Sequence, residues 1–131
     1  MSNLFEGMEI ISQYTREQAL EDGVLYDLSK WGKEMGIKYP IACTSTLYGY
    51  INPPSNLEGV EGQSLDWRAY DTVFMLAMAI QGQGNKGKDT LFFSVAYLNN
   101  NEEYDEVKIK AICGPGDQGE PVITLMLPDE S

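Results

Sequence analysis

Histidine is absent from the chain, and cysteine occurs only twice, as Cys43 and Cys113. Without histidine there is no Ser-His or Cys-His nucleophile pair of the usual kind, and two isolated thiols cannot supply the four ligands of a structural zinc site. Neither cysteine belongs to a Cys-x-x-Cys redox pair. We expect both to be small core residues, able to form a disulfide only if their strands lie side by side, and we expect no metal or other cofactor.

Long apolar runs are also missing. The longest, from Val73 to Ile80, has eight residues and is too short to cross a bilayer. The first residues carry acids instead of the basic and then apolar segment of a signal peptide. With 131 residues and 43% hydrophobic content, the chain suits one domain, residues 1–131, around a single core. We therefore expect a cytoplasmic protein with no membrane contact.

Basic residues are few, with nine Lys and Arg against twenty Asp and Glu, for a net charge of −11. Residues 1–36 contribute −4, residues 37–88 contribute 0 and residues 89–131 contribute −7. Such a chain is repelled by phosphate backbones and attracted to basic surfaces. This predicts a protein partner, a basic one, and no direct binding to nucleic acid. Acids that only keep a small domain soluble would give the same totals, and the sequence leaves the oligomeric state open.

Short helices and extended pieces alternate in the first half of the chain. They are a helix capped by Thr15, with Gln18 completing a capping box, and ended by Asp22-Gly23, an extended piece at 24–28, a helix at 30–35 capped by Ser29, an extended segment at 41–43 and a helix capped by Thr44. Proline and glycine then predict a surface loop at 52–63.

The strongest helix signal covers residues 65–81, where Trp67, Tyr70 and Phe74 recur at three- and four-residue steps. Past Val73 the helix is apolar on every side, so we expect it to be buried against a sheet. Three antiparallel strands are expected to form that sheet, at 90–98, 105–113 and 120–127, and the last is expected in its middle because it is apolar on both faces. The predicted fold is a single α+β domain, an antiparallel sheet of three or more strands packed against one main helix with short N-terminal helices.

Two glycine-rich segments come close to nucleotide-binding motifs. Residues 82–89 lie within one residue of a P-loop, but Asp89 stands where a magnesium-binding hydroxyl is needed, and the loop follows a helix and not a strand. Gly114 to Gly119 has the spacing of a dinucleotide fingerprint, but Glu120-Pro121 and a strand follow where a helix N-terminus is required. A tight turn explains these glycines better.

Two sets of acidic residues are the candidate sites. The first is an acidic patch of Glu102, Glu103, Asp105 and Glu106, in a polar turn, which we expect to bind the basic partner. If its carboxylates form ordered rows, they could imitate the phosphates of DNA and inhibit a host nucleic-acid-binding or defence protein. Exposed carboxylates lack the burial that raises a carboxyl pKa for acid catalysis, so the patch gives no support to an enzyme.

The second set belongs to a different class of function. Asp22, Asp27, Asp117 and Glu120 are the candidate polar groups of a small hydrolase or ligand-binding domain, which would use a cleft between the 52–63 loop and the Gly114–Gly119 turn. Asp117 and Glu120 lack the ligand spacing of a calcium loop. Large apolar side chains that could support self-association are Trp31, Phe92, Phe93 and Tyr104.

Two segments carry a family resemblance. Ser12 to Ser29 and Gly114 to Asp129 resemble the opening and closing signatures of an uncharacterised family of small bacterial proteins often carried on plasmids, phages and other mobile elements, and Gly36 to Thr44 also fits. The resemblance covers most of residues 10–130 and supplies no catalytic residues. It implies an accessory role in a mobile element's dealings with its host. Together with the charge, it favours a non-enzymatic protein-binding accessory or modulator.

Overall fold

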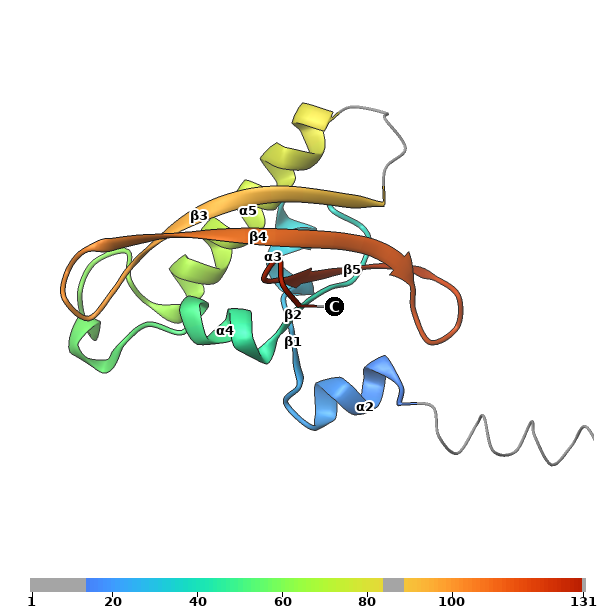
Figure 1. The fold of residues 1–131 in the computed structure, drawn as a ribbon, viewed down its shortest axis with the longest axis horizontal. Coiled ribbons are helices and arrows are strands. Elements are labelled where there is room, and N and C mark those ends of the chain that lie inside the picture. Colours follow the sequence, from blue (N-terminus) through green and yellow to red (C-terminus); the bar gives the residue numbers. More distant parts are fainter. Residues whose placement is uncertain (1–13, 84–88, 131) are drawn as a thin grey trace, which may run out of the picture.

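The computed structural model describes residues 14–83 and 89–130 and shows an α+β fold, as predicted (Figure 1). Its elements, in chain order, are α2 (Arg16–Glu21), β1 (Leu25–Asp27), α3 (Ser29–Glu34), β2 (Ile41–Thr44), α4 (Ser45–Ile51), the 3-10 turn η1 (Ser55–Leu57), α5 (Leu65–Gln83), β3 (Thr90–Leu98), β4 (Tyr104–Pro115) and β5 (Pro121–Met126). The one long helix, α5, packs on the sheet, and the short helices precede it in the chain.

The sheet has five strands in the order β1-β2-β5-β4-β3. β3, β4 and β5 are antiparallel neighbours, and β5 lies in the middle, both as predicted. The two extended pieces of the first half form β1 and β2, and β2 pairs with β5 in parallel, so the whole sheet is mixed. Burial on both faces explains the continuous apolar sequence of β5, because Val122, Ile123, Leu125 and Met126 are all at most 6% exposed.

α5 lies against one face of the sheet, and its two sides differ sharply. Ala69, Val73 and Leu76 are fully buried in the core. The prediction that the helix is buried on every side past Val73 is wrong, because Phe74 is 45% exposed and Met78 is 50% exposed. The elements around α5 cover only its sheet-facing side in the described part of the chain.

Local hydrogen bonds explain how the short helices begin. The predicted capping box of α2 is present, since the Thr15 hydroxyl accepts from the Gln18 amide and the Gln18 side chain accepts from the Thr15 amide. Thr44 caps α4 as predicted. The predicted Ser29 cap is wrong, because α3 begins at Ser29 itself. The Ser29 hydroxyl instead accepts from the backbone N–H of Ile41 and so ties α3 to β2.

The two cysteines lie on strands that flank β5 and are not neighbours. Cys43 on β2 is opposite Leu125, and Cys113 on β4 is opposite Ile123. Both thiols are free. Cys43 is a core residue as predicted, and its burial raises the pKa of its thiol to about 12, whereas Cys113 is only half-buried.

Candidate functional site

Three of the four acids of the predicted polar site surround Arg16. The Arg16 guanidinium lies on β5, where it donates to the Thr124 hydroxyl at 2.7 Å and to the Ile123 carbonyl at 2.9 Å. Its burial lowers the pKa of Arg16, and the charges of Asp117, Asp27 and Glu120 oppose that shift. These acids therefore compensate the charge of a half-buried arginine.

Asp117 joins the two signature segments of the chain. Its two carboxylate oxygens accept from the backbone N–H groups of Arg16 at 2.8 Å and Glu17 at 3.0 Å, in the first turn of α2. These two bonds lower the pKa of the Asp117 carboxyl. The signatures thus meet in space, and the contact between them fastens α2 to the β4–β5 turn.

The other acids of this set also serve the fold. Glu120 accepts from the Gln118 N–H inside the β4–β5 turn, where Gly119 has the positive φ of +81° expected for a tight turn. Asp27 accepts from the Ser29 N–H at the start of α3. Asp22 accepts from the Tyr14 hydroxyl. None of the four carboxylates lines any of the three pockets described below.

The predicted cleft between the 52–63 loop and the Gly114–Gly119 turn is not formed. Asn56, in the loop, donates to the carbonyl of Asn100, which lies in the β3–β4 turn. The β4–β5 turn follows the other end of the twelve-residue strand β4 (Figure 1). The loop also fails to be wholly exposed, because Leu57 is only 2% exposed.

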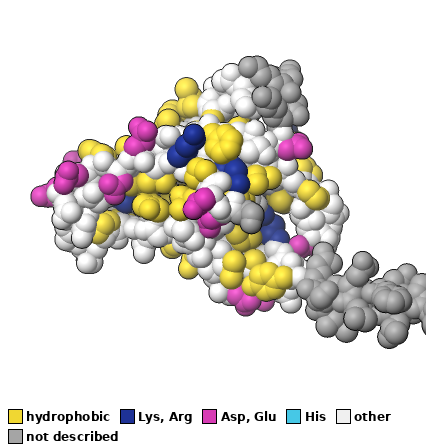
Figure 2. All heavy atoms as spheres, in the orientation of Figure 1, with side chains coloured by type: hydrophobic (Ala, Val, Ile, Leu, Met, Phe, Trp, Pro, Cys, Tyr) yellow, Lys and Arg dark blue, Asp and Glu magenta, His cyan; other side chains and the backbone are white. Residues whose placement is uncertain are grey.

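The acidic patch occupies the end of the β3–β4 hairpin. Asn99 orders this turn, since its side chain accepts from the N–H groups of Asn101 and Glu103 and donates to the Asp105 carboxylate. Figure 2 shows acidic side chains gathered at the end of the molecule where this hairpin lies. Glu102, Glu103, Asp105 and Glu106 are all exposed, as expected for a polar turn.

The solvent side of α5 carries an apolar surface that the sequence did not reveal. Trp67 is 55% exposed, and Phe74 and Met78 follow it at steps of seven and four residues, which place all three on one line opposite the core. Tyr70 fills the line, with its ring edge-on to Trp67 and stacked on Phe74 at centroid distances of 6.1 and 6.4 Å. We call these four residues the α5 stripe.

Acids border the α5 stripe on both sides. A groove toward α3 is lined by Lys30, Glu34 and Asp66, and Asp66 accepts from the Trp31 ring N–H at 2.9 Å. A second groove, toward β3, includes Asp71 and Glu106, a member of the acidic patch. The stripe and the patch are thus continuous, and acids outnumber bases along the border.

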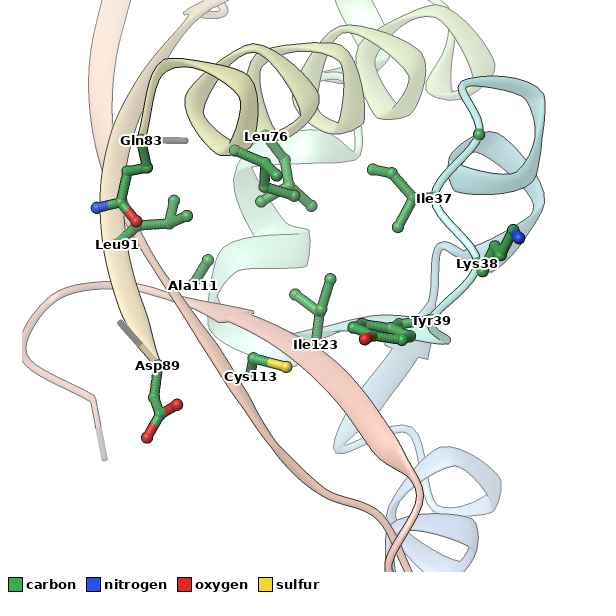
Figure 3. A pocket seen from close by; sticks show the side chains of 12 residues that line it. Ile37, Lys38, Tyr39, Leu76, Gln83, Asp89, Leu91, Ala111, Cys113 and Ile123 are labelled. Carbon is green, nitrogen blue, oxygen red and sulfur yellow. The ribbon is translucent and has the colours of Figure 1, made fainter. Parts of the chain in front are cut away.

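A pocket of about 440 Å³ lies between the C-terminal half of α5 and the sheet (Figure 3). Leu76 of α5 faces Ala111 of β4 and Ile123 of β5 across it, while Lys38 and Asp89 lie at its margin. Its volume is in the range of small-molecule sites. Across residues 14–83 and 89–130, no group of three or more acidic or thiol side chains is placed to hold a metal ion.

The glycine-rich segments now have a partial explanation. Gly114 to Gly119 closes the β4–β5 hairpin, as the tight-turn interpretation predicted, with the Gly119 N–H bonded to the Gly116 carbonyl. Of the P-loop-like segment, residues 84–88 lie outside the described residues. Asp89 accepts through its backbone carbonyl from the Cys113 N–H, next to the start of β3.

Arg68 is a buried arginine that the sequence analysis did not single out. It is 4% exposed and donates to the backbone carbonyls of Tyr50, Ile51 and Leu98 and to the Gln63 side chain, at 2.7 to 2.9 Å. Burial lowers the pKa of Arg68. Its contacts join the end of α4, the following loop and the end of β3, so its role is in the fold.

These features define a small acidic α+β protein whose distinctive surfaces are an apolar helix stripe and an acidic hairpin. A family model described as a family of unknown function (DUF6573) matches residues 1–131, and the chain belongs to this family. No curated protein and no solved structure matches the chain. Among the described helices, none has the length and apolar character needed to cross a membrane.

Proposed function

We propose that this protein works without catalysis, by binding a basic amphipathic helix of a partner protein through the α5 stripe. The exposed line of Trp67, Phe74 and Met78 carries the proposal. Fully burying one such side chain contributes roughly 1.5–3 kcal/mol, and aromatic residues and methionine are enriched in the centres of protein interfaces. The three- and four-residue spacing of the stripe matches the anchor spacing of a helix packed alongside.

The acids around the stripe select the chemistry of the partner. Asp66, Asp71 and Glu106 border it directly, and the rest of the acidic patch extends the negative surface along the hairpin. Such a surface accelerates association with a basic partner by about 10 to 1,000-fold and repels acidic ones. This chemistry suits an accessory or modulator encoded by a mobile element that engages a host protein, the role that the family resemblance implies.

A designed peptide tests this function directly. The probe is a fluorescently labelled synthetic helix with leucines on one face and lysines beside them, compared with the same helix carrying glutamates in place of the lysines. We expect fluorescence anisotropy to show that the lysine helix binds and the glutamate helix does not, and that the affinity for the lysine helix falls as salt rises. Equal affinity for both helices would reject the proposal that the acidic residues select a basic partner.

Two variants separate the apolar contribution from the charge. Replacing Trp67 and Met78 together by serine should weaken binding of the lysine helix at least about tenfold, because two central contacts are lost. The matched control is Tyr104→Ser, which removes a side chain that is 67% exposed on the hairpin, outside the stripe. Reversing the charges of Glu102, Glu103, Asp105 and Glu106 should reduce the association rate and its salt dependence. Unchanged binding by the double serine variant would overturn the proposal.

A DNA-mimicking inhibitor is the second candidate, and the ordering of the acidic hairpin by Asn99 favours it. In this case the protein would compete with DNA for a host nucleic-acid-binding or defence protein, with an affinity that falls steeply as salt rises. A competition assay with labelled DNA measures this directly. Binding that leaves the DNA in place would reject the mimic.

A further inference from the structure

We propose that β3 pairs antiparallel with β3 of a second copy of the chain, centred on Ser94, so that two sheets join into one. The two edges of the sheet are built differently. β1, at one edge, has only three residues and ends in Asp27. β3, at the other edge, has nine residues, Thr-Leu-Phe-Phe-Ser-Val-Ala-Tyr-Leu, with no charge, proline or glycine. Proteins commonly protect such an edge with those features, so the unprotected edge of β3 is suited to strand addition.

Two hydrogen bonds beside β3 identify the backbone groups that point outward. The Asn99 N–H bonds to the Glu103 carbonyl, and the Cys113 N–H bonds to the Asp89 carbonyl. The backbone N–H and carbonyl groups of successive residues point to alternate sides of an antiparallel strand. Those of the odd-numbered residues of β3 therefore bond to β4, and those of the even-numbered residues point away from it. The Leu98 carbonyl agrees with this assignment, since it points outward and accepts from Arg68. Phe92, Ser94 and Ala96 therefore offer their N–H and carbonyl groups at the open edge.

These three residues are self-complementary about Ser94. An antiparallel pair centred there sets Ser94 opposite its own copy and Phe92 opposite Ala96 of the other copy. All are outward-pointing positions, so this register forms about six backbone hydrogen bonds, two for each of the three pairs. Phe92 is 52% exposed and Ala96 is a small exposed residue on the same face. The large ring of each copy thus gains a place to pack, which a one-residue change of register would not provide.

The charges next to β3 are compatible with the same register. On β4, Lys110 is opposite Phe92, Lys108 is opposite Ser94 and Glu106 is opposite Ala96. Each row through a Phe92–Ala96 pair therefore ends in a lysine on one copy and a glutamate on the other. The two Lys108 residues, like the lysine and glutamate of each such row, are three strand spacings apart, about 14 Å, which exceeds the screening length of about 8 Å at physiological salt. The two lysines therefore do not prevent the pairing.

A second copy also covers apolar surface beside the edge. Phe74 and Met75 of α5 line a groove together with Ser94 and Ala96, so a strand added to β3 lies next to them, whereas Trp67 and Met78 of the α5 stripe lie outside this groove. The net charge of −11 on each copy opposes association, and salt screens that repulsion. We therefore expect the dimer to strengthen as salt rises, which is the opposite of the salt dependence expected for the basic helix.

Sedimentation equilibrium of the full chain over a dilution series, at low and at physiological salt, tests the dimer. We expect the mass to approach twice that of one chain, with a smaller dissociation constant at the higher salt. Ala96→Lys places a charge opposite Phe92 of the other copy, inside the pairing, and should raise that constant at least about tenfold. Ser94→Pro removes an outward N–H and should act in the same direction. Tyr104→Lys adds the same charge outside the pairing and should leave the dimer intact.

Three results would overturn the proposal. The first is a measured mass equal to that of one chain at every protein and salt concentration. The second is an Ala96→Lys variant that dimerises as tightly as the original, and the third is a Tyr104→Lys variant whose dimer is weakened as much as that of Ala96→Lys. Circular dichroism of each variant shows whether its monomer is folded. The Trp67 and Met78 double variant should dimerise normally while losing the basic helix. Ser94→Pro, which adds no charge to the acidic border of the α5 stripe, should lose the dimer while retaining the helix, so failure of the dimer is distinguishable from failure of the proposed function.

Discussion

Arg68→Met removes the donor that holds three parts of the fold together, and we expect it to destabilise the protein strongly. Methionine keeps much of the length and apolar stem of the side chain, so the loss is mainly that of the guanidinium. Three backbone carbonyls, those of Tyr50, Ile51 and Leu98, then lose a charged donor, and so does the Gln63 side chain.

The expected loss follows from the number and burial of those acceptors. A buried acceptor left without a donor costs about 1–3 kcal/mol, and at 4% exposure of Arg68 water has little access to replace it. Partial relaxation of the loop and the recovered hydration cost of the guanidinium reduce the sum. We expect a loss of about 3 kcal/mol in the free energy of unfolding, a large share of the ~5–15 kcal/mol typical of a domain.

Urea unfolding followed by circular dichroism measures this loss. With a slope of roughly 2 kcal/mol per M, the midpoint should fall by about 1.5 M. The unfolding midpoint of Arg68→Lys should lie between those of the original protein and Arg68→Met, because a single ammonium cannot reach all four acceptors. Lys33→Met, which removes the same charge from an exposed position on α3, should change the free energy by less than about 0.5 kcal/mol. An Arg68→Met protein as stable as the Lys33→Met control would refute the argument.

Other residues give sharp tests as well. Asp117→Asn should lower the free energy of unfolding at neutral pH, and urea unfolding should show that the difference in this free energy between variant and original narrows below about pH 4. The reason is that a carboxyl with a lowered pKa stabilises the fold above its ordinary pKa and loses that effect as the pH falls through its pKa in the folded protein. Iodoacetamide should modify Cys113 before Cys43, whose buried thiol has a pKa of about 12; peptide mass spectrometry showing the reverse order would contradict the burial. Gly119→Ala should cost about 1 kcal/mol in urea unfolding because of its φ of +81°, whereas Gly49→Ala, inside α4 with open space around it, should be neutral or stabilising.

Features set by neighbours in the sequence were predictable. The capping box of Thr15 and Gln18 and the tight turn ended by Gly119 each depend on a few consecutive residues, and the structure contains both. The prediction that Ser29 caps α3 was wrong because its hydroxyl accepts a hydrogen bond from the backbone N–H of Ile41, twelve residues away. A local pattern gives the groups that can bond but not the more distant groups that compete for them.

Pairing between strands far apart in the sequence accounts for the remaining differences between the predicted and the observed fold. β2 has only four residues, and nothing in its sequence indicates that it pairs in parallel with β5, some eighty residues later. The exposure of the α5 stripe was hidden for a related reason. When a helix is apolar on all sides, periodicity no longer shows which side faces the core, and only the positions of the other elements decide it.

The candidate polar site illustrates why acidic residues are difficult to assign from sequence. Asp27, Asp117 and Glu120 were grouped because polar and glycine-rich segments often carry chemistry, and they do come together in space, around Arg16. Arg16 is the residue that explains them, since its half-buried charge needs nearby carboxylates and Asp117 fixes the helix that carries it. These carboxylates already have partners within the fold, whereas those of the hairpin and the α5 border are exposed. The search for a partner should therefore begin at the α5 stripe and not at the signature segments.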